Sequence, residues 1–383
     1  MRLKLMAVMI TAVFAVYCCG CTGTPDVQSE IVSSDSEPQT PDASTGAGVW
    51  AEIGNPLKNT TSKSSIARFP ADMIVFDGAL HICYGEWNEN SGPITMKRYD
   101  LTEEKWINGS VLPEEAVLRF NVADGALYCT GIDAQEDWSR GNYYTYSDGE
   151  WKKHRDIPGG VHVFDIEKHG DDLFFGIGTA GNEDCAVVIR ADGTAETLAF
   201  VYEDGSAPKY DSANYSNERC YDLFAAGNEL FAIREQDIYK WDGEKFVFNV
   251  HWDGFANFDH FSGTQYLQTD LAFGKYVYFP IGMLYRTADG TNVEYLPLPD
   301  EDYGVTDAYA DGGRLFVLAA RMDGDGFESV VYELNDGDGF EKIAEYRGDA
   351  PAISLAADGN DLYIALARKG SDDSGMILKY EVD

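Results

Sequence analysis

The segment DGALHICYG at Asp77–Gly85 is the first of seven similar segments that decide the fold of this sequence. In each segment a glycine precedes a short apolar run, and glycine supplies the positive φ that a tight hairpin turn requires. The other six segments are DGALYCTG (Asp124–Gly131), HGDDLFFGIG (His169–Gly178), AGNELFAIR (Ala226–Arg234), FGKYVYFPIG (Phe273–Gly282), GGRLFVLAA (Gly312–Ala320) and DGNDLYIALA (Asp358–Ala367). Their turn glycines recur after 47, 45, 57, 47, 38 and 47 residues. The chain is therefore built from a repeated hairpin.

Further strands surround each hairpin in the same order. An apolar strand enters the turn, and after a polar loop a third strand ends near a tyrosine, as in MKRYD at Met96–Asp100. A fourth strand often opens with an aromatic residue, at Trp106, Trp151, Phe246 and Phe340. Four strands in a period of about 47 residues are typical of β-propeller blades. The sequence shows no long helical periodicity.

The last repeat is incomplete, and this predicts how the ring closes. It ends with the third strand MILKYEVD at Met376–Asp383, whereas VWAEI at Val49–Ile53 resembles a fourth strand. We expect Trp50 to lie on an outer strand that pairs with the third strand around Lys379 and Tyr380, because closure removes open sheet edges. The sequence thus predicts an all-β, seven-bladed propeller over residues 49–383, closed by its N-terminal strand.

The blades resemble kelch-type repeats, in which a third-strand tyrosine is followed by a tryptophan, as in RYDLTEEKW at Arg98–Trp106. The resemblance covers the whole body and implies a propeller fold. The Gly-Gly pair that kelch blades carry after the second strand is absent.

The N-terminus carries the features of an export signal. Arg2 and Lys4 precede an apolar run from Leu5 to Tyr17, which is shorter than the roughly 20 residues of a membrane span. Gly20-Cys21 resembles the cleavage site of bacterial lipoprotein precursors, and this resemblance implies acylation of Cys21. Ordinary secretion is the alternative.

The resulting domain organisation has three parts. Residues 1–20 are a lipoprotein signal peptide, and residues 21–48 are the acylated cysteine and an acidic linker rich in Ser, Thr and Pro. Such a linker buries too little surface to fold, so we expect a disordered tether. The propeller is then lipid-anchored on the extracytoplasmic face of the cell membrane.

Composition excludes some partners. The chain has 65 acidic and 29 basic residues, a formal net charge of -36. Nucleic acid is excluded because its phosphates need Lys and Arg. We interpret the charge as that of a soluble surface.

Cys83 and Cys129 lie in apolar strands, where we expect buried, reduced thiols.

A small polar residue precedes each turn glycine by four to six positions, which predicts a ring around the central channel. These residues are Asp72, Asn121, Asp165, Asp222, Asp270, Asp307 and Ser354. Five of the seven are Asp. The side chains of the ring either bind a metal or cationic ligand on the axis, or form hydrogen bonds with backbone N–H groups of neighbouring blades. We favour the second interpretation.

Two acidic turns share the hexapeptide DGDGFE. Their oxygen-bearing residues are Asp323, Asp325 and Glu328 in the first and Asp336, Asp338 and Glu341 in the second. Clustered oxygens suit Ca²⁺, although polar Asp-Gly turns are the simpler interpretation. No cofactor is firmly implied, and Ca²⁺ is the one that these turns would suit.

Two aromatic stretches, 201–223 and 251–268, exceed what the repeat needs and are expected as loops on one rim. Their candidate binding residues are Tyr210, Tyr215, His251, Trp252, His260 and Tyr266. Long loops on a rigid scaffold often carry function. The alternative is that these aromatics cover the rim and pack against the blades.

The motifs favour binding over catalysis without deciding between them. No H-E-x-x-H, G-x-S-x-G or phosphate-binding loop occurs in the sequence. The G-x-G-x-x-G at Gly176–Gly181 continues as a hairpin rather than a helix. We therefore expect a binding or scaffolding module for an extracellular protein or glycan. The alternative is an extracellular polymer-acting enzyme, a glycosidase or lyase, that uses a rim pocket.

Overall fold

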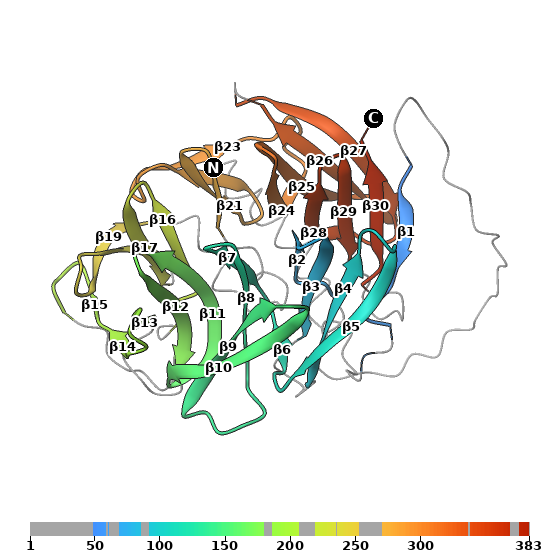
Figure 1. The fold of residues 1–383 in the computed structure, drawn as a ribbon. Coiled ribbons are helices and arrows are strands. Elements are labelled where there is room, and N and C mark those ends of the chain that lie inside the picture. The colour runs from blue at the N-terminus through green and yellow to red at the C-terminus, as the bar shows by residue number, and fades with distance from the viewer. Residues whose placement is uncertain are drawn as a thin grey trace, which may run out of the picture.

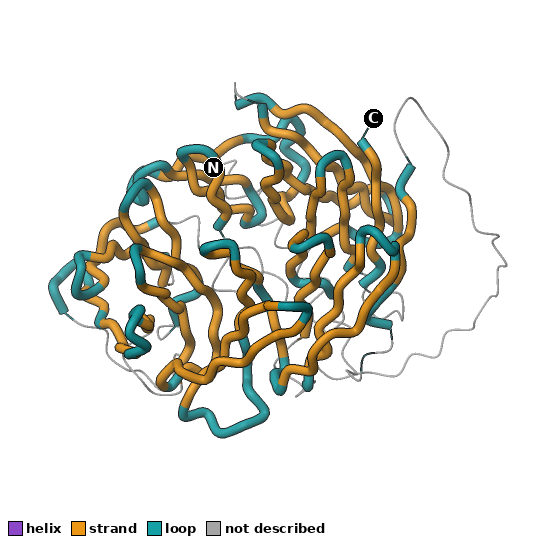
Figure 2. Tube along the Cα trace, in the orientation of Figure 1, coloured by secondary structure: helices purple, strands orange, loops and turns teal. Residues whose placement is uncertain are grey.

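The computed structural model is built from β-strands and turns (Figure 2). It describes residues 49–58, 60, 69–85, 92–179, 186–206, 219–234, 236–252, 270–335, 338–367 and 375–382. The predicted signal peptide, Cys21 and the predicted linker lie outside this part of the chain. Within the described ranges no helix is long and apolar enough to cross a membrane.

Seven sheets, each with four antiparallel strands in a row, form the blades (Figure 1). Blades 1 to 4 contain β2 (Asp72–Phe76), β3 (Ala79–Gly85), β4 (Ile94–Asp100) and β5 (Lys105–Leu112); β7 (Phe120–Ala123), β8 (Ala126–Thr130), β9 (Arg140–Ser147) and β10 (Glu150–Pro158); β11 (Gly160–His169), β12 (Asp172–Thr179), β13 (Ala186–Ile189) and β14 (Ala195–Leu198); and β16 (Asp222–Ala226), β17 (Glu229–Arg234), β18 (Asp237–Trp241) and β19 (Phe246–His251). Blades 5 to 7 contain β20 (Leu271–Phe273), β21 (Tyr276–Pro280), β22 (Leu284–Thr287) and β23 (Val293–Leu296); β24 (Gly304–Asp311), β25 (Arg314–Asp323), β26 (Gly326–Leu334) and β27 (Phe340–Gly348); and β28 (Ala352–Asp358), β29 (Asp361–Leu366), β30 (Ile377–Glu381) and β1 (Ala51–Gly54). The predicted seven-bladed propeller is confirmed.

The N-terminal strand closes the ring as the incomplete last repeat predicted. In blade 7, β1 pairs with β30, with Ala51 opposite Lys379. Trp50, one residue before β1, lies 5.0 Å from Tyr380 between ring centroids. Its indole N–H also donates to the Glu345 carbonyl of blade 6 at 2.8 Å. The first and last strands of the body therefore share one sheet.

The repeated turn glycines have the backbone conformation that the hairpins require. Gly78 and Gly125 have φ of 70° and 74°, and the corresponding glycines of the other five blades also have positive φ. An added Cβ at these two positions would meet open space, so backbone conformation rather than crowding favours glycine there.

Two short strands that the repeat does not predict tie neighbouring blades together. The strand β6 (Ala116–Val117) pairs with β3 of blade 1, and Ala116 also bridges to Ile132 of blade 2. Ile132 in turn bridges to His162 of blade 3. The strand β15 (Phe200–Val201) runs parallel to β19 of blade 4. Blades 1 to 3 are thus linked by backbone bridges on the face where inner strands begin.

The innermost strand of every blade faces the axis. The sheet order places β2, β7, β11, β16, β20, β24 and β28 at one edge of their sheets. Residues of β28 lie beside β24 and β2, and residues of β11 lie beside β7 and β16. Polar side chains on these strands therefore meet at the centre.

Candidate functional site

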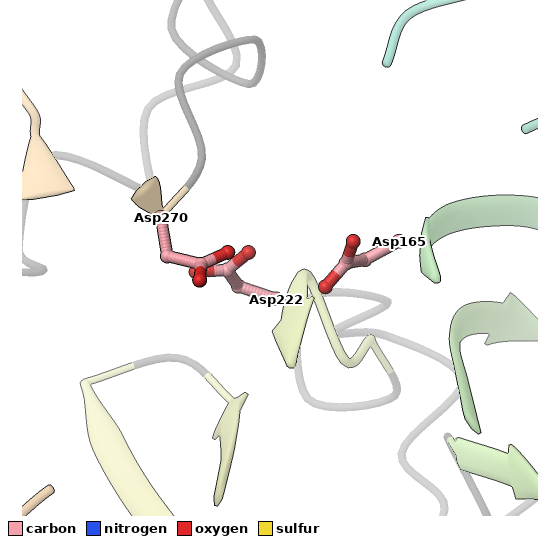
Figure 3. Close-up of side chains that lie close together, drawn as sticks. All are labelled: Asp165, Asp222 and Asp270. Carbon is pink, nitrogen blue, oxygen red and sulfur yellow. The ribbon is translucent and has the colours of Figure 1, made fainter. Parts of the chain in front are cut away.

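The seven residues of the predicted ring lie at corresponding places on the inner strands. Six lie within the strands, and Asp270 immediately precedes β20. The strand register shifts just before Asp165, Asp307 and Ser354 in blades 3, 6 and 7. Figure 3 shows the side chains of Asp165, Asp222 and Asp270 converging from three blades. One oxygen of each lies within 4.8 Å of one oxygen of the other two, which makes this trio a candidate metal centre.

Arg119 occupies the middle of this trio. It comes from the connection between blades 1 and 2, and its side chain is 5 % exposed. One terminal nitrogen lies 2.7 Å from Asp165 Oδ1 and 2.6 Å from Asp222 Oδ1, and the other lies 2.5 Å from Asp270 Oδ1. A single guanidinium thus joins blades 2, 3, 4 and 5 at the axis.

Other oxygens of the ring bind backbone amides of the following blade. Asp72 accepts a hydrogen bond from Phe120 N at 2.7 Å. Asp165 accepts from Leu223 N at 2.6 Å. In the same way, Asp307 of blade 6 accepts from the N–H of Leu355 in blade 7, at 2.6 Å. These contacts agree with the interpretation that ring carboxylates lock neighbouring blades.

The axis carries more acid than base. Glu167 lies two residues beyond Asp165 on β11 and faces the same side of the strand. Burial, together with Asp270 and Asp165, raises the pKa of Glu167 to about 9, although Arg119 acts in the opposite direction. Burial also raises the pKa of Asp270 to about 6 and that of Asp222 well above its usual range. Protons therefore neutralise part of the acidic cluster that the single guanidinium does not neutralise.

A second polar cluster lies where the inner strands of blades 3 and 4 begin. His162 Nε2 lies 3.5 Å from Asp133 Oδ1. The His162 ring stacks on Phe164 with centroids 5.5 Å apart, and the Arg219 guanidinium lies 5.9 Å from the centre of the Phe164 ring. Burial and Arg219 lower the pKa of His162 to about 3, so the imidazole is neutral at physiological pH. Burial raises the pKa of Asp133 to about 6.

The loop of residues 131–139, between β8 and β9, leads outward from this cluster and carries an exposed tryptophan. We call it the β8–β9 loop; it projects from the lower edge of the molecule in Figure 1. Trp138 is 57 % exposed. Arg155 donates to the Asp137 carbonyl at 2.7 Å and pairs with Glu136 at 2.7 Å. Lys153 also contacts Glu136, at 2.6 Å. The loop is thus fastened to β10 beside its exposed indole.

The base of the β8–β9 loop is held by a buried carboxyl group. Glu114 is 1 % exposed and accepts hydrogen bonds from Asn142 at 2.6 Å and Tyr144 at 2.5 Å. An added Cβ on Gly131 would lie 2.7 Å from the Glu114 carboxyl carbon, so glycine is needed there. Burial raises the pKa of Glu114 to about 7. Gln135 N also donates to the Pro113 carbonyl at 2.8 Å.

Of the six rim residues named from the sequence, Tyr210, Tyr215, His260 and Tyr266 lie outside the described residues. His251 is exposed and lies 2.7 Å from Asp237. Trp252 packs against Phe279 and Tyr285 of blade 5, with centroids 5.6 Å and 4.9 Å apart. Trp252 therefore covers a blade, as the alternative interpretation of these aromatics expected.

The two DGDGFE hexapeptides differ in structure. Asp323 begins a turn between β25 and β26, and the buried Glu328 receives the guanidinium groups of Arg321 and Arg347. Any Ca²⁺ at this turn would compete with the Arg321 and Arg347 guanidinium groups for the Glu328 carboxylate. Of the second set, Asp336 lies outside the described residues, Glu341 is exposed and Asp338 pairs with Arg286 at 2.6 Å. Asp325 is also exposed.

Among the described cysteines, Cys83, Cys129 and Cys220 are buried and form no disulfide. Burial raises the pKa of Cys83 and of Cys129 well above the usual range. The thiols are thus held in the unreactive form, as their apolar strands predicted.

Sequence reasoning missed Arg119 and Trp138. Arg119 directly precedes Phe120, the first residue of an inner strand, and a cation at that point of an acid-rich repeat was an available signal. Trp138 lies in an acidic, polar stretch between the second and third strands of blade 2, where no blade needs an aromatic. Only the structure shows that one points to the axis and the other to solvent.

Comparison with solved structures shows the fold. A structure described as "Streptogramin B lyase structure" has a TM-score of 0.55 and 12% identity, and the match covers 88% of this chain and 98% of that chain. A catalytically inactive virginiamycin B lyase from Staphylococcus aureus with quinupristin gives 0.54 and 13%, covering 88% and 99%. The selenomethionine form from the same species gives 0.50 and 12%, covering 85% and 98%. At this identity the likeness is one of fold alone.

Comparisons with protein-family models and with curated proteins find no match.

Proposed function

We propose that this protein is an exported, lipid-anchored binding module that recognises a neutral glycan through its β8–β9 loop. The observation that carries the proposal is the exposed indole of Trp138 on a loop that is fastened on both sides. Anchoring rests on the Gly20-Cys21 motif and would place the propeller outside the cell membrane.

The indole suits a sugar ring because it has a large apolar face and little conformational freedom to lose on binding. Trp138 is 57 % exposed, whereas Trp151 of the same blade is 8 % exposed and part of the core. Keeping this much apolar indole surface in contact with water costs free energy, and a ligand that covers the surface removes that cost. Trp138 is therefore better explained by binding than by folding.

The surroundings of Trp138 add polar groups for sugar hydroxyls. Glu136 and Arg155 lie beside it on the loop and on β10, with side chains 35 % and 25 % exposed. Planar carboxylate and guanidinium groups donate or accept several hydrogen bonds in fixed directions. Because they already form an ion pair, they are oriented before a ligand arrives, which reduces the entropy lost on binding.

Overall charge narrows the class of glycan. A net charge of -36 repels anionic polymers such as uronic-acid polysaccharides. A neutral glycan meets no such repulsion. The proposal is therefore a neutral oligosaccharide rather than an acidic one.

A glycan array with the soluble body from Val49 onward tests this proposal. We expect the wild-type protein to retain neutral glycans, and Trp138→Ala to weaken binding by about tenfold or more, the effect of losing a central aromatic contact. The matched control is Met322→Ala, because Met322 is a similarly exposed apolar residue, 54 % exposed, on another blade. Equal binding by Trp138→Ala and wild type, or retention of proteins but no glycans, would contradict the proposal.

One observation favours an enzyme as the second candidate. Asp133 has a left-handed backbone conformation with φ of 50°, an unusual one for a residue other than glycine, and burial raises its pKa to about 6. Its side chain is 15 % exposed at the base of the same loop. A carboxyl group that titrates near neutral pH can serve as a general acid or base. Cleavage of arrayed glycans that is lost in Asp133→Asn would favour an extracellular polymer-acting enzyme.

A further inference from the structure

Glu114 lies between two backbone contacts that hold the start of the β8–β9 loop. Glu115 N donates to the Ile132 carbonyl at 3.0 Å, and Gln135 N donates to the Pro113 carbonyl at 2.8 Å. The residues on either side of Glu114 therefore clamp the loop at two points. Glu114 itself is 1 % exposed. A change at its carboxyl group is thus transmitted to the loop through its two chain neighbours.

The two oxygens of the Glu114 carboxyl group differ in their surroundings. Oε1 accepts hydrogen bonds from the Asn142 amide at 2.6 Å and from the Tyr144 hydroxyl at 2.5 Å. Oε2 is buried and receives no hydrogen bond. An added Cβ on Gly131 would lie 2.8 Å from Oε2, so the backbone at the first residue of the loop covers this oxygen. A carboxylate with one oxygen shut off from donors and from water is costly to bury.

A proton on Glu114 removes this cost. The protonated carboxyl group is neutral and has an O–H to donate. The side-chain oxygen of Asn142 is also buried without a donor, so the same cluster contains an acceptor. A flip of the Asn142 amide exchanges its nitrogen and oxygen, which places that acceptor 2.6 Å from Oε1. The protonated form therefore satisfies the cluster better than the ionised form.

The charged and titratable groups that face Glu114 do not reverse this preference. Lys153 of β10 favours the ionised form, whereas Glu136 of the loop opposes it, and these two side chains already pair at 2.6 Å. Cys129 of β8 and Tyr144 of β9 stay neutral, because burial raises the pKa of each. Burial accordingly raises the pKa of Glu114 to about 7, although the hydrogen bonds to Oε1 act in the opposite direction.

We propose that Glu114 is a positioning residue whose proton controls how firmly the β8–β9 loop is held, so that the loop presents Trp138 best when Glu114 is neutral. Ionisation favours states in which the loop moves off Oε2 and water reaches this oxygen. The inference rests on the proposed function, because glycan binding at Trp138 would then weaken as the pH rises. It adds a proton as the regulator of that site.

Hydrogen–deuterium exchange of the full chain without glycan, at about pH 6 and about pH 8, tests this control of the loop. The pKa of Glu114 in the closed loop lies above its ordinary value of 4.5, so protection is lost as the pH rises through about 7. Relative to the rate of an unfolded peptide at each pH, exchange of residues 131–139 should rise about three- to tenfold in the wild type. Glu114→Gln stays neutral and keeps the shape of the side chain, so it should show little change.

Asp133→Asn separates this effect from the other carboxyl group of the loop that titrates near neutral pH. Burial raises the pKa of Asp133 to about 6, so Asp133 ionises before Glu114, and its variant should keep most of the wild-type response. Circular dichroism checks that both variants are folded. Wild-type protection that is equal at both pH values overturns the proposal, whether or not any glycan binds. The proposal also fails if Glu114→Gln responds like wild type, or if Asp133→Asn does not respond.

Titration with a neutral glycan that the array retains, at the same two pH values, tests the link to binding. The affinity of the wild type should fall from the lower to the higher pH, and that of Glu114→Gln should change less. A constant wild-type affinity would overturn the regulation of the glycan site. A protein that retains no glycan contradicts the proposed function alone, and the exchange experiment then still decides the role of Glu114.

Discussion

Replacing Arg119 with methionine should destabilise the propeller by about 3–5 kcal/mol, because it leaves buried carboxylates without their partner. The side chain of Arg119 is 5 % exposed, and those of Asp165 and Asp222 are fully buried. Methionine keeps much of the volume but supplies no charge. Urea denaturation followed by circular dichroism measures the change in the free energy of unfolding.

The control for this prediction is Arg155→Met. Arg155 also pairs with two acids, Glu136 and Asp137, but its side chain is 25 % exposed. Water screens such a surface pair, so the loss should be about 1 kcal/mol or less. If both substitutions have the same small effect, Arg119 does not hold the blades together.

Deleting residues 49–57 should destabilise the whole ring by at least about 4 kcal/mol. The deletion removes β1, and with it Trp50, and also the fully buried Leu57. Loss of one large buried side chain alone costs about 2–5 kcal/mol. The deletion also removes the Ile53 carbonyl, which accepts a hydrogen bond from the Trp106 indole N–H at 2.8 Å. The edge of β30 is then left open to pair with other molecules.

A matched pair of chains measures this effect by thermal unfolding. One chain begins at Val49 and keeps β1, and the other begins at Lys58 and lacks it. We expect a single cooperative transition in the first chain and a markedly lower midpoint, with aggregation, in the second. Equal midpoints would mean that β1 does not close the ring.

The sequence predicted the architecture well because each blade repeats the same local signals. Turn glycines such as Gly78 mark the hairpins, and Trp106 and Trp151 mark outer strands that the structure places at β5 and β10. These signals depend on local backbone conformation and on the alternation of strands, which a single sequence shows. Because the last repeat lacks a fourth strand, the sequence also predicted that the N-terminal strand, β1, completes the last blade.

The site was harder to predict because it depends on contacts between distant residues. Asp165, Asp222 and Asp270 could be placed on inner strands, but their partner Arg119 comes from a connection that the repeat does not describe. Likewise, the exposure of Trp138 depends on where the β8–β9 loop packs. Only three-dimensional packing distinguishes it from buried aromatics such as Trp151.

The most direct test of glycan recognition is hydrogen–deuterium exchange with and without a neutral glycan that the array retains. We expect the glycan to slow exchange in peptides covering residues 131–139 of the wild-type protein. In Trp138→Ala the same glycan concentration should give little protection there, and the β25–β26 turn should exchange equally with and without glycan in both proteins. Protection confined to other blades, with residues 131–139 unchanged, would contradict the proposed site.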